Sequence, residues 1–336
     1  MIKIGIDGAG SAEAGELIRL LINHPDVELV QVCQPELSGR DISDVHHGLV
    51  GEKKLAFVKK LDYDAIDIAF CTASASDLSL ERADEFIASK TDPESGYVIF
   101  LSPDDAMLEA SAPYFLQCHD ETTEGDAAAE SDDWTDTVVY GVPELNRKPL
   151  VRGSRKVVVP TAVESITAVT LYPLRKSGRF PERIDLNVKG ARDIMEGYRK
   201  NKTAIERRIS SMLTSMSGEN VDARLFLTDD ESTRRGVSLS VDMPLTVTID
   251  EIRSYVIDVY DDHHLAHLSG KELSYDEVEG TDNCLIEISQ LGAGVFRINS
   301  VADARLRGGA GEAVHIMNLF AGLFEKTGLH LKASNF

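Results

Sequence analysis

The sequence predicts an α/β fold, in which a doubly wound parallel sheet is followed by a central α+β domain. Short apolar segments alternate with helical segments over residues 2–101, which is typical of a parallel sheet covered by helices. A glycine-rich turn follows the first apolar segment, as a tight strand-to-helix connection favours. From about Val151 onward the pattern changes to strands interleaved with longer helices, and 336 residues suffice for two cores.

The first strand, turn and helix follow one another at the N-terminus. Ile2–Ile6 is an apolar run that ends in DGAGSAEAG, and the following ELIRLLINH has helical spacing because Ile18, Leu21 and Ile22 share one face. The acidic segment 119–137 contains few apolar residues, and we expect it to be a solvated loop. Other elements predicted here are strands at 27–33, 66–72 and 97–102 and a helix at 76–88.

The second part of the chain is predicted to be a mixed α+β domain. Long helical stretches are expected at 192–216 and 249–259, the first with an apolar stripe that faces the core. A last apolar helix is predicted at Ala313–Phe324, after the glycine-rich RGGAG, and need not belong to this domain. Strands are predicted at 184–188, 223–227, 237–241, 284–288 and 295–301.

Composition excludes several classes of function. The chain carries 35 Lys and Arg against 56 Asp and Glu, and a net charge of -21 would repel nucleic acid and anionic membranes. The N-terminus lacks a basic segment before an apolar core, and no apolar run is long enough for a membrane span, so we expect a cytoplasmic protein. The 4 cysteines form no Cys-x-x-Cys pair, so neither a structural zinc site nor a disulfide framework is predicted.

The glycine-rich turn by itself leaves two interpretations open. Gly8, Gly10 and Gly15 do not form the Gly-x-Gly-x-x-Gly pattern, and any tight strand-to-helix turn favours glycine. The turn does, however, follow the first strand and open a helix, whose N-terminal amides and dipole suit a pyrophosphate. Dinucleotide binding and a purely structural turn are therefore both compatible with this segment.

Several stretches together resemble the N-acetyl-γ-glutamyl-phosphate reductase family, which is related to the aspartate-semialdehyde dehydrogenases. In family order they are GIDGAGSAEAGELIRLLINHPDVELV, ISDVHHGLVG, VVYGVPELNR, VPTAVESITAVTLYPL and ADARLRGGAGEAVHIMNLFAGL. The resemblance implies a Rossmann domain of residues 1–150 and 308–336, a dimerisation and substrate domain of residues 151–307, and NADPH-dependent reduction of an acyl phosphate to a semialdehyde. It also implies a set of ligand contacts: for the cofactor Gly8, Gly10, Ser11, Ala12, Thr72 and Ala73, and for the substrate Arg192.

The residues that carry the family chemistry are missing from this chain. In the family a cysteine thiolate attacks the acyl phosphate, the thioester accepts hydride, and a histidine moves the protons. Matching Pro160 and Pro173 to the family prolines places Ala162 at the nucleophile, so the sequence predicts no catalytic cysteine. No histidine occurs between His119 and His263, where the family base belongs.

Two cofactor motifs are altered as well. The family commonly has Ser-Arg after the second strand to hold the 2′-phosphate of NADP, whereas this chain has Gln34 and Pro35 there. Without a guanidinium the preference for NADP loses its usual basis, so NADP and NAD both remain candidate cofactors. Of the three family glycines in the phosphate turn only Gly8 is kept, with Ser11 and Ala14 at the other two positions.

Two other segments contain reactive or metal-binding residue types. Cys71 ends a predicted strand at the edge where ligands approach a parallel sheet, and is either a displaced nucleophile or, more simply, a small buried residue. In DDHHLAH, Asp261, His263, His264 and His267 have the spacing of metal ligands on one helical face. The simpler interpretation is a solvated helix end, where histidines suit the negative end of the helix dipole, so no metal site is predicted.

Two classes of function follow from these observations. The first is a non-catalytic or diverged homologue with a degenerate site, which binds a dinucleotide or small metabolite and forms a homodimer, a larger homo-oligomer or a complex with an active paralogue. The second is an active NAD(P)H-dependent oxidoreductase that reduces a small carbonyl or acyl-phosphate substrate without the cysteine. Loss of the donor histidine weighs against the second class.

Overall fold

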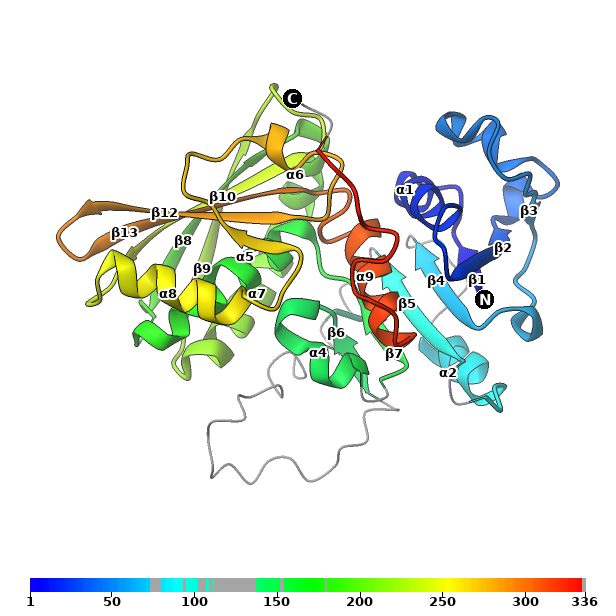
Figure 1. The fold of residues 1–336 in the computed structure, drawn as a ribbon, viewed down its shortest axis with the longest axis horizontal. Helices are drawn as coiled ribbons and strands as arrows, with labels where there is room; N and C mark the ends of the chain where they lie inside the picture. Colours follow the sequence, from blue (N-terminus) through cyan, green and yellow to red (C-terminus); the bar gives the residue numbers. More distant parts are fainter. Residues whose placement is uncertain are drawn as a thin grey trace. The chain divides into compact units, whose positions relative to one another are not determined.

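Two compact units make up the chain, each with its own sheet (Figure 1). The computed structural model describes residues 1–72, 80–92, 95–101, 107–108, 111, 137–151, 154–178 and 180–333. The first unit contains Met1–Pro160 and Gly309–His330, and the second contains Thr161–Gly308 and Leu331–Phe336. The predicted combination of a parallel-sheet α/β part and a mixed α+β part is confirmed.

The first unit is built on a sheet of parallel strands. In the described part of the chain the strand order is β3-β2-β1-β4-β5-β7-β6, and every pairing is parallel. Because the order reverses at β1, the carboxyl ends of β1 and β4 lie side by side at the point where parallel sheets bind ligands. The strands are β1 (Ile2–Asp7), β2 (Val27–Cys33), β3 (Phe57–Val58), β4 (Ile68–Thr72), β5 (Tyr97–Leu101), β6 (Val138–Tyr140) and β7 (Lys156–Val158).

Helices cover this sheet because their apolar residues recur at helical spacing. In α1, Leu17, Ile18 and Leu21 are buried, and Ser11 caps the first turn. Helix α9 comes from the far end of the chain and packs against α1, α4 and β5; it begins at Ala310 rather than at the predicted Ala313. The helices of this unit include α1 (Ala12–Leu21), α2 (Leu80–Ala88), α4 (Pro143–Val151) and α9 (Ala310–Phe320).

The second unit has a mixed sheet in the order β11-β12-β13-β10-β8-β9 within its described residues. The central pairings are antiparallel, whereas β11 with β12 and β8 with β9 pair in parallel. The five predicted strands are confirmed, and the short β11 was not predicted. The strands are β8 (Arg183–Gly190), β9 (Asp222–Asp229), β10 (Gly236–Pro244), β11 (Ala266–Leu268), β12 (Cys284–Gly292) and β13 (Val295–Asp303).

Helix α5 lies at the centre of the second unit. All of its residues are buried, and it packs against β10, β12 and β13 on one side and against α7 on the other. The predicted helix at 192–216 is two helices, because the chain leaves helical geometry at Asn201, whose φ is -111° and ψ is 16°. The helices of this unit include α5 (Ala162–Leu171), α6 (Arg192–Lys200), α7 (Lys202–Ser217) and α8 (Ile249–Tyr260).

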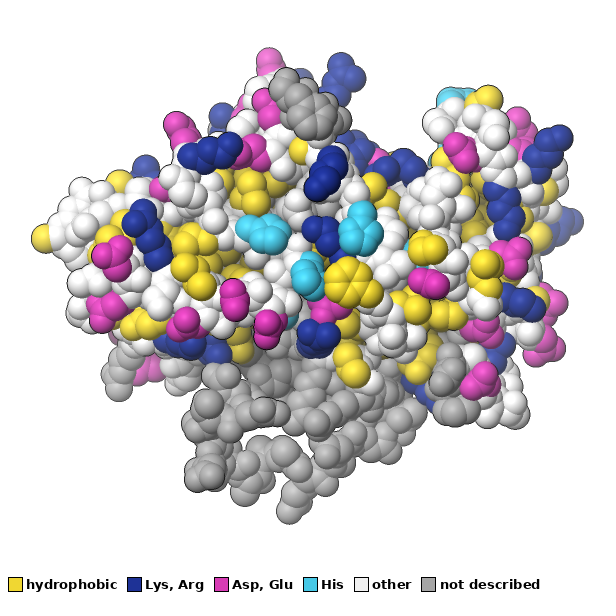
Figure 2. Space-filling model, viewed as in Figure 1, with side chains coloured by type: hydrophobic (Ala, Val, Ile, Leu, Met, Phe, Trp, Pro, Cys, Tyr) yellow, Lys and Arg dark blue, Asp and Glu magenta, His cyan; other side chains and the backbone are white. Residues whose placement is uncertain are grey.

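The surface can be compared with the prediction from composition that nucleic acid and anionic membranes are not partners. On the face drawn in Figure 2, acidic and basic side chains are interspersed, and no basic patch of the kind that follows a phosphate backbone is visible there. None of the described helices is long and apolar enough to cross a membrane. Residues 76–79 of one predicted helix and residues 119–136 of the predicted acidic loop lie outside the described part of the chain.

Candidate functional site

The turn between β1 and α1 depends on glycine at its first position. Gly8 has φ +78°, and a Cβ built there would lie 1.8 Å from the carbonyl oxygen of Thr72. The Thr72 hydroxyl donates hydrogen bonds to the carbonyls of Asp7 (3.1 Å) and Gly8 (2.8 Å). The end of β4 is thereby fastened to the turn, and only glycine fits at position 8.

The start of α1 leaves two amides available. The Ser11 hydroxyl accepts a hydrogen bond from the Ala14 amide at 3.0 Å, and the Gly10 amide donates to Gln34 Oε1 at 3.3 Å. Within the described residues no acceptor is found for the amides of Ala12 and Glu13. Helix N-termini with unpaired amides attract phosphate groups, so this turn has the geometry of an anion site.

The predicted cofactor residues are brought together at this turn. Gly8, Gly10, Ser11 and Ala12 form the connection itself, and Thr72 lies against it from β4. Ala73 lies outside the described residues. Their contact with a cofactor stays a prediction.

A pocket of about 250 Å³ lies beside the turn, at the carboxyl ends of β1 and β2. It is lined by residues that are far apart in the sequence, and several of them are charged. The charged and amide side chains are Asp7, Gln34, Glu36, Lys59, Lys60 and Arg82. Gly8, Gln34 and Pro35 were predicted from the sequence to lie at the cofactor site, whereas the charged residues were missed; the Lys-Lys pair directly after an apolar segment was the available signal.

The Glu36 carboxylate of this pocket is oriented by a neighbouring side chain. Gln34 Nε2 donates to the Glu36 carboxylate at 2.7 Å. Hydrogen bonds from its own backbone amide and from Gln34 keep the pKa of Glu36 below its ordinary value, so it is ionised at neutral pH. Asp7 is only 7% exposed, and burial together with the charge of Asp7 raises the pKa of the Tyr63 hydroxyl.

The start of α5 is closed by contrast. Ala162, at the predicted position of the family nucleophile, is the first residue of α5 and is 2% exposed. Gly308 has φ +66°, and a Cβ built there would lie 2.2 Å from the Ala162 amide nitrogen. The backbone at residue 308 therefore lies directly against the backbone of Ala162, and there is no room for a side chain at position 308.

A buried ion pair lies at the start of α5. Arg208 Nε, from α7, donates to Glu164 Oε1 at 2.6 Å, and the two side chains are 4% and 0% exposed. The other carboxylate oxygen accepts from the Thr161 amide at 3.1 Å and from the Thr161 hydroxyl. Burial raises the pKa of the nearby Tyr198, whose hydroxyl also hydrogen-bonds to the backbone of Val163. The polar groups at this helix start are thus satisfied within the chain.

Arg192 lies at the first position of α6 on the surface of the second unit. Its guanidinium is 3.8 Å from Asp229 and 3.4 Å from Glu231, and its side chain is 72% exposed. Exposed pairs of this kind contribute little to stability, so the arginine is free to exchange partners with an anion. Its contact with substrate stays a prediction.

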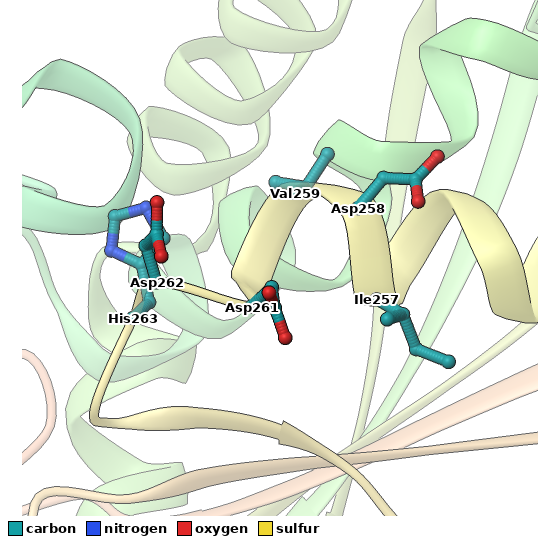
Figure 3. Close-up of a pocket in the computed structure, with 6 residues that line it drawn as sticks. All are labelled: Ile257, Asp258, Val259, Asp261, Asp262 and His263. Atoms are coloured by element: carbon teal, nitrogen blue, oxygen red, sulfur yellow. The ribbon is translucent and has the colours of Figure 1, made fainter.

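The DDHHLAH segment does not form one helical face. Helix α8 ends at Tyr260, and His267 belongs to strand β11. The carboxylates of Asp258 and Asp261, which line a pocket of about 420 Å³ with His263, point in different directions (Figure 3). Within the described residues no three metal-ligating side chains are gathered.

Cys71 occupies a buried position in β4. Its side chain is 6% exposed and its thiol is not in a disulfide. Burial disfavours the thiolate, which is the reactive form of cysteine. The geometry therefore favours the structural interpretation of this residue over the displaced nucleophile.

Comparison with known proteins connects this geometry to a family. Residues 3–152 match the family model described as semialdehyde dehydrogenase, NAD binding domain. The chain is 30% identical to proteins named N-acetyl-gamma-glutamyl-phosphate reductase from Parabacteroides distasonis and Phocaeicola vulgatus, over 354 and 357 residues that cover 100% of each chain.

Solved structures of more distant proteins share the fold. An aspartate semialdehyde dehydrogenase II from Vibrio cholerae, complexed with ASA, has a TM-score of 0.62 at 15% identity and covers 96% of this chain and 99% of its own. An aspartate semialdehyde dehydrogenase from Candida albicans, solved with NADP, has a TM-score of 0.61 at 12% identity and covers 95% of this chain and 98% of its own. With the full-length identity and the domain match, the chain belongs to the N-acetyl-γ-glutamyl-phosphate reductase family.

Proposed function

We propose that this family member does not carry out thiol-dependent acyl-phosphate reduction and acts by binding a dinucleotide or a small metabolite. The proposal rests on the start of α5, where Ala162, which the sequence match aligns with the family nucleophile, is buried. A methyl group has no lone pair with which to attack a carbonyl, so no covalent intermediate forms there. Loss of the nucleophile from a covalent enzyme costs on the order of 10⁶-fold in turnover.

The surroundings of Ala162 support the same proposal. Reduction of an acyl group places negative charge on a carbonyl oxygen, which needs hydrogen-bond donors directed at it. Here the Thr161 amide donates to the Glu164 carboxylate, and the Arg208 guanidinium is engaged by the same carboxylate. Both donors are thus already directed at a carboxylate of the chain itself.

The β1–α1 turn fits the diphosphate of the cofactor that the NAD binding family model implies. Gly8 lets backbone and ligand approach closely, and the amides of Ala12 and Glu13 would hold phosphate oxygens. A bound nicotinamide cofactor supplies hydride chemistry, whereas the residues of this turn bind and orient it. Binding of NADP or NAD, with or without turnover of a small molecule, therefore belongs to the proposal.

Assembly through the second unit is also part of the proposal. In β8 the outward residues Arg183, Asp185, Asn187 and Lys189 are exposed, so one face of the mixed sheet has no helix on this strand. Phe226 on the edge strand β9 is an exposed aromatic residue. We expect a homodimer or larger homo-oligomer, or pairing with an active paralogue; light scattering that gives only the 36.8 kDa monomer mass at micromolar concentration would contradict this. The cytoplasmic location stays a prediction.

The test of the catalytic proposal is NADPH oxidation with N-acetyl-γ-glutamyl phosphate by the native chain and by Ala162→Cys. We expect no turnover above background from either, because the new thiol would be buried and would lack an imidazole to lower its pKa. Ala162→Ser is the matched control, since it buries a polar atom of similar size without a thiol.

Turnover by the native chain at an ordinary enzymatic rate would contradict the proposal. Cys71→Ser would then be the next variant to assay, because Cys71 near the carboxyl end of β4 is the cysteine that the sequence suggested as a displaced nucleophile. Reduction of a free carbonyl by NADH or NADPH would instead support an oxidoreductase that works without a covalent step.

A further inference from the structure

We propose that the pocket beside the β1–α1 turn selects NAD(H) over NADP(H), with Glu36 as the specificity-determining residue. This inference rests on the proposed binding of a dinucleotide at the turn. It concerns the adenosine end of the ligand, where the two cofactors differ only by a phosphate on the ribose 2′-oxygen. A carboxylate can accept a hydrogen bond from a 2′-hydroxyl, whereas it repels a 2′-phosphate.

Glu36 stands where the ribose of a dinucleotide would lie. It belongs to a short 3₁₀ helix, Pro35–Leu37, directly after β2, and it lines the pocket together with Gly8. In parallel-sheet dinucleotide folds an acidic residue about 20 residues beyond the glycine turn binds the ribose hydroxyls. Glu36 follows Ala14, which aligns with the last family glycine of the turn, at about that distance in the sequence, which fits the role.

The Glu36 carboxylate is tied to the phosphate turn through Gln34. Gln34 Oε1 accepts from the Gly10 amide at 3.3 Å, and Gln34 Nε2 donates to Glu36 at 2.7 Å. One side chain therefore fixes the distance between the turn that would hold the diphosphate and the acid that would meet the ribose. A carboxylate oriented in advance loses less conformational entropy when a ligand arrives.

The basic residues of the pocket are the competing influence. Lys59, Lys60 and Arg82 also line it, and a 2′-phosphate would be attracted to them. All three are exposed, as Glu36 is, so solvent screens charges of both signs; the lysine charges are carried on flexible stems, whereas Gln34 orients the Glu36 carboxylate. Asp7, a second and buried carboxylate of the pocket, adds to the negative charge on the strand side. The Glu36 carboxylate, which Gln34 orients, is thus a directed hydrogen-bond acceptor, and this favours the ribose hydroxyl over the phosphate.

The test is a pair of calorimetric titrations of the full chain, one with NADH and one with NADPH. We expect NADH to bind about tenfold more tightly or better. In Glu36→Gln the ratio of the two dissociation constants should fall by about tenfold, because the repulsion of NADPH and the acceptor for the hydroxyl are both weakened. The double variant Lys59→Gln with Lys60→Gln is the matched control and should leave NADH as the tighter ligand.

A third variant locates the binding site. Ala12→Glu adds a carboxylate at an exposed position of the α1 first turn, where acidic residues are compatible with the helix, and should weaken both cofactors equally. Tighter binding of NADPH by the native chain, or an unchanged ratio in Glu36→Gln, would overturn the selectivity while leaving dinucleotide binding intact. Absence of binding by either cofactor, or binding unaffected by Ala12→Glu, would overturn the proposed use of the turn itself.

Discussion

Helices α1 and α5 each follow a strand of the parallel sheet, yet their first turns are used in opposite ways. The first turn of α1 is at the surface, with Ala12 and Glu13 exposed and their amides without an internal acceptor in the described residues. The first turn of α5 is buried and contains its own anion, the carboxylate of Glu164. The comparison teaches that a helix N-terminus serves an external anion only where the chain does not supply one itself.

The largest expected effect is a loss of stability when the buried ion pair at the start of α5 is broken. Arg208→Ala would leave the Glu164 carboxylate buried without its guanidinium, and should lower the free energy of unfolding by about 3–5 kcal/mol. Denaturant titration of the variant and native chains would measure the difference.

Two control variants test whether the loss of stability in Arg208→Ala comes from the buried ion pair. Arg199→Ala removes an exposed partner of Asp229 and should cost less than about 1 kcal/mol. Glu164→Gln combined with Arg208→Met removes both charges and should cost less than Arg208→Ala alone. A loss from Arg208→Ala no larger than that from Arg199→Ala would mean that the buried pair does not hold the start of α5.

The two glycines next to these helix starts provide a second test. Gly8→Ala and Gly308→Ala should each cost about 2 kcal/mol or more, because both residues have positive φ and a Cβ would collide with backbone atoms. Gly39→Ala is the matched control: Gly39 has φ +87° but nothing within 4 Å of a Cβ, so only the backbone cost of about 1 kcal/mol is expected. Equal losses at all three positions, measured by thermal unfolding, would show that the collisions are relieved by small shifts.

The smallest expected effect is a pH dependence of stability that comes from His24, shortly after the C-terminal end of α1. His24 Nε2 is 3.0 Å from the Asn318 side chain of α9, and burial lowers the pKa of His24 below 6.5. Neutral His24 is accommodated in the folded state, whereas the protonated form is disfavoured there by burial. Because the pKa is lower in the folded state, the contribution of neutral His24 to stability is complete above pH 6.5 and is lost as the pH falls through the folded pKa. Thermal unfolding followed from pH 8 to pH 5 should show a decline on the acid side that His24→Gln reduces; an unchanged decline in the variant would assign it to other groups.

Much of the scaffold could be predicted because it is encoded locally. The apolar run Ile2–Ile6, the glycine turn and the helical spacing after it stand next to one another, and the structure confirms strand, turn and helix there. The break at Asn201 and the three-residue strand β11 were missed, because neither changes the apolar pattern of the longer segment around it.

The two sites could be predicted only in part. The turn residues were found from sequence, but the pocket beside it combines Glu36, Lys59 and Arg82, which the parallel strand order brings to one edge of the sheet. Arg208 was assigned no role, because it is 44 residues from Glu164 and an ion pair between helices leaves no periodic signal. A glutamate inside an otherwise apolar helix, as in AVESITAVTL, was the signal that a buried partner exists.

Helix α9 has a consequence for how the chain is made. It is buried along its entire length against α1, α4 and β5, although about 150 residues separate it from the rest of the first unit. On the ribosome, therefore, the N-terminal sheet emerges long before the segment that completes its core. Most of the second unit is one segment, Thr161–Gly308, which can fold during this interval. The first unit meanwhile keeps an apolar face exposed until α9 is made, and in this period chaperones protect nascent chains.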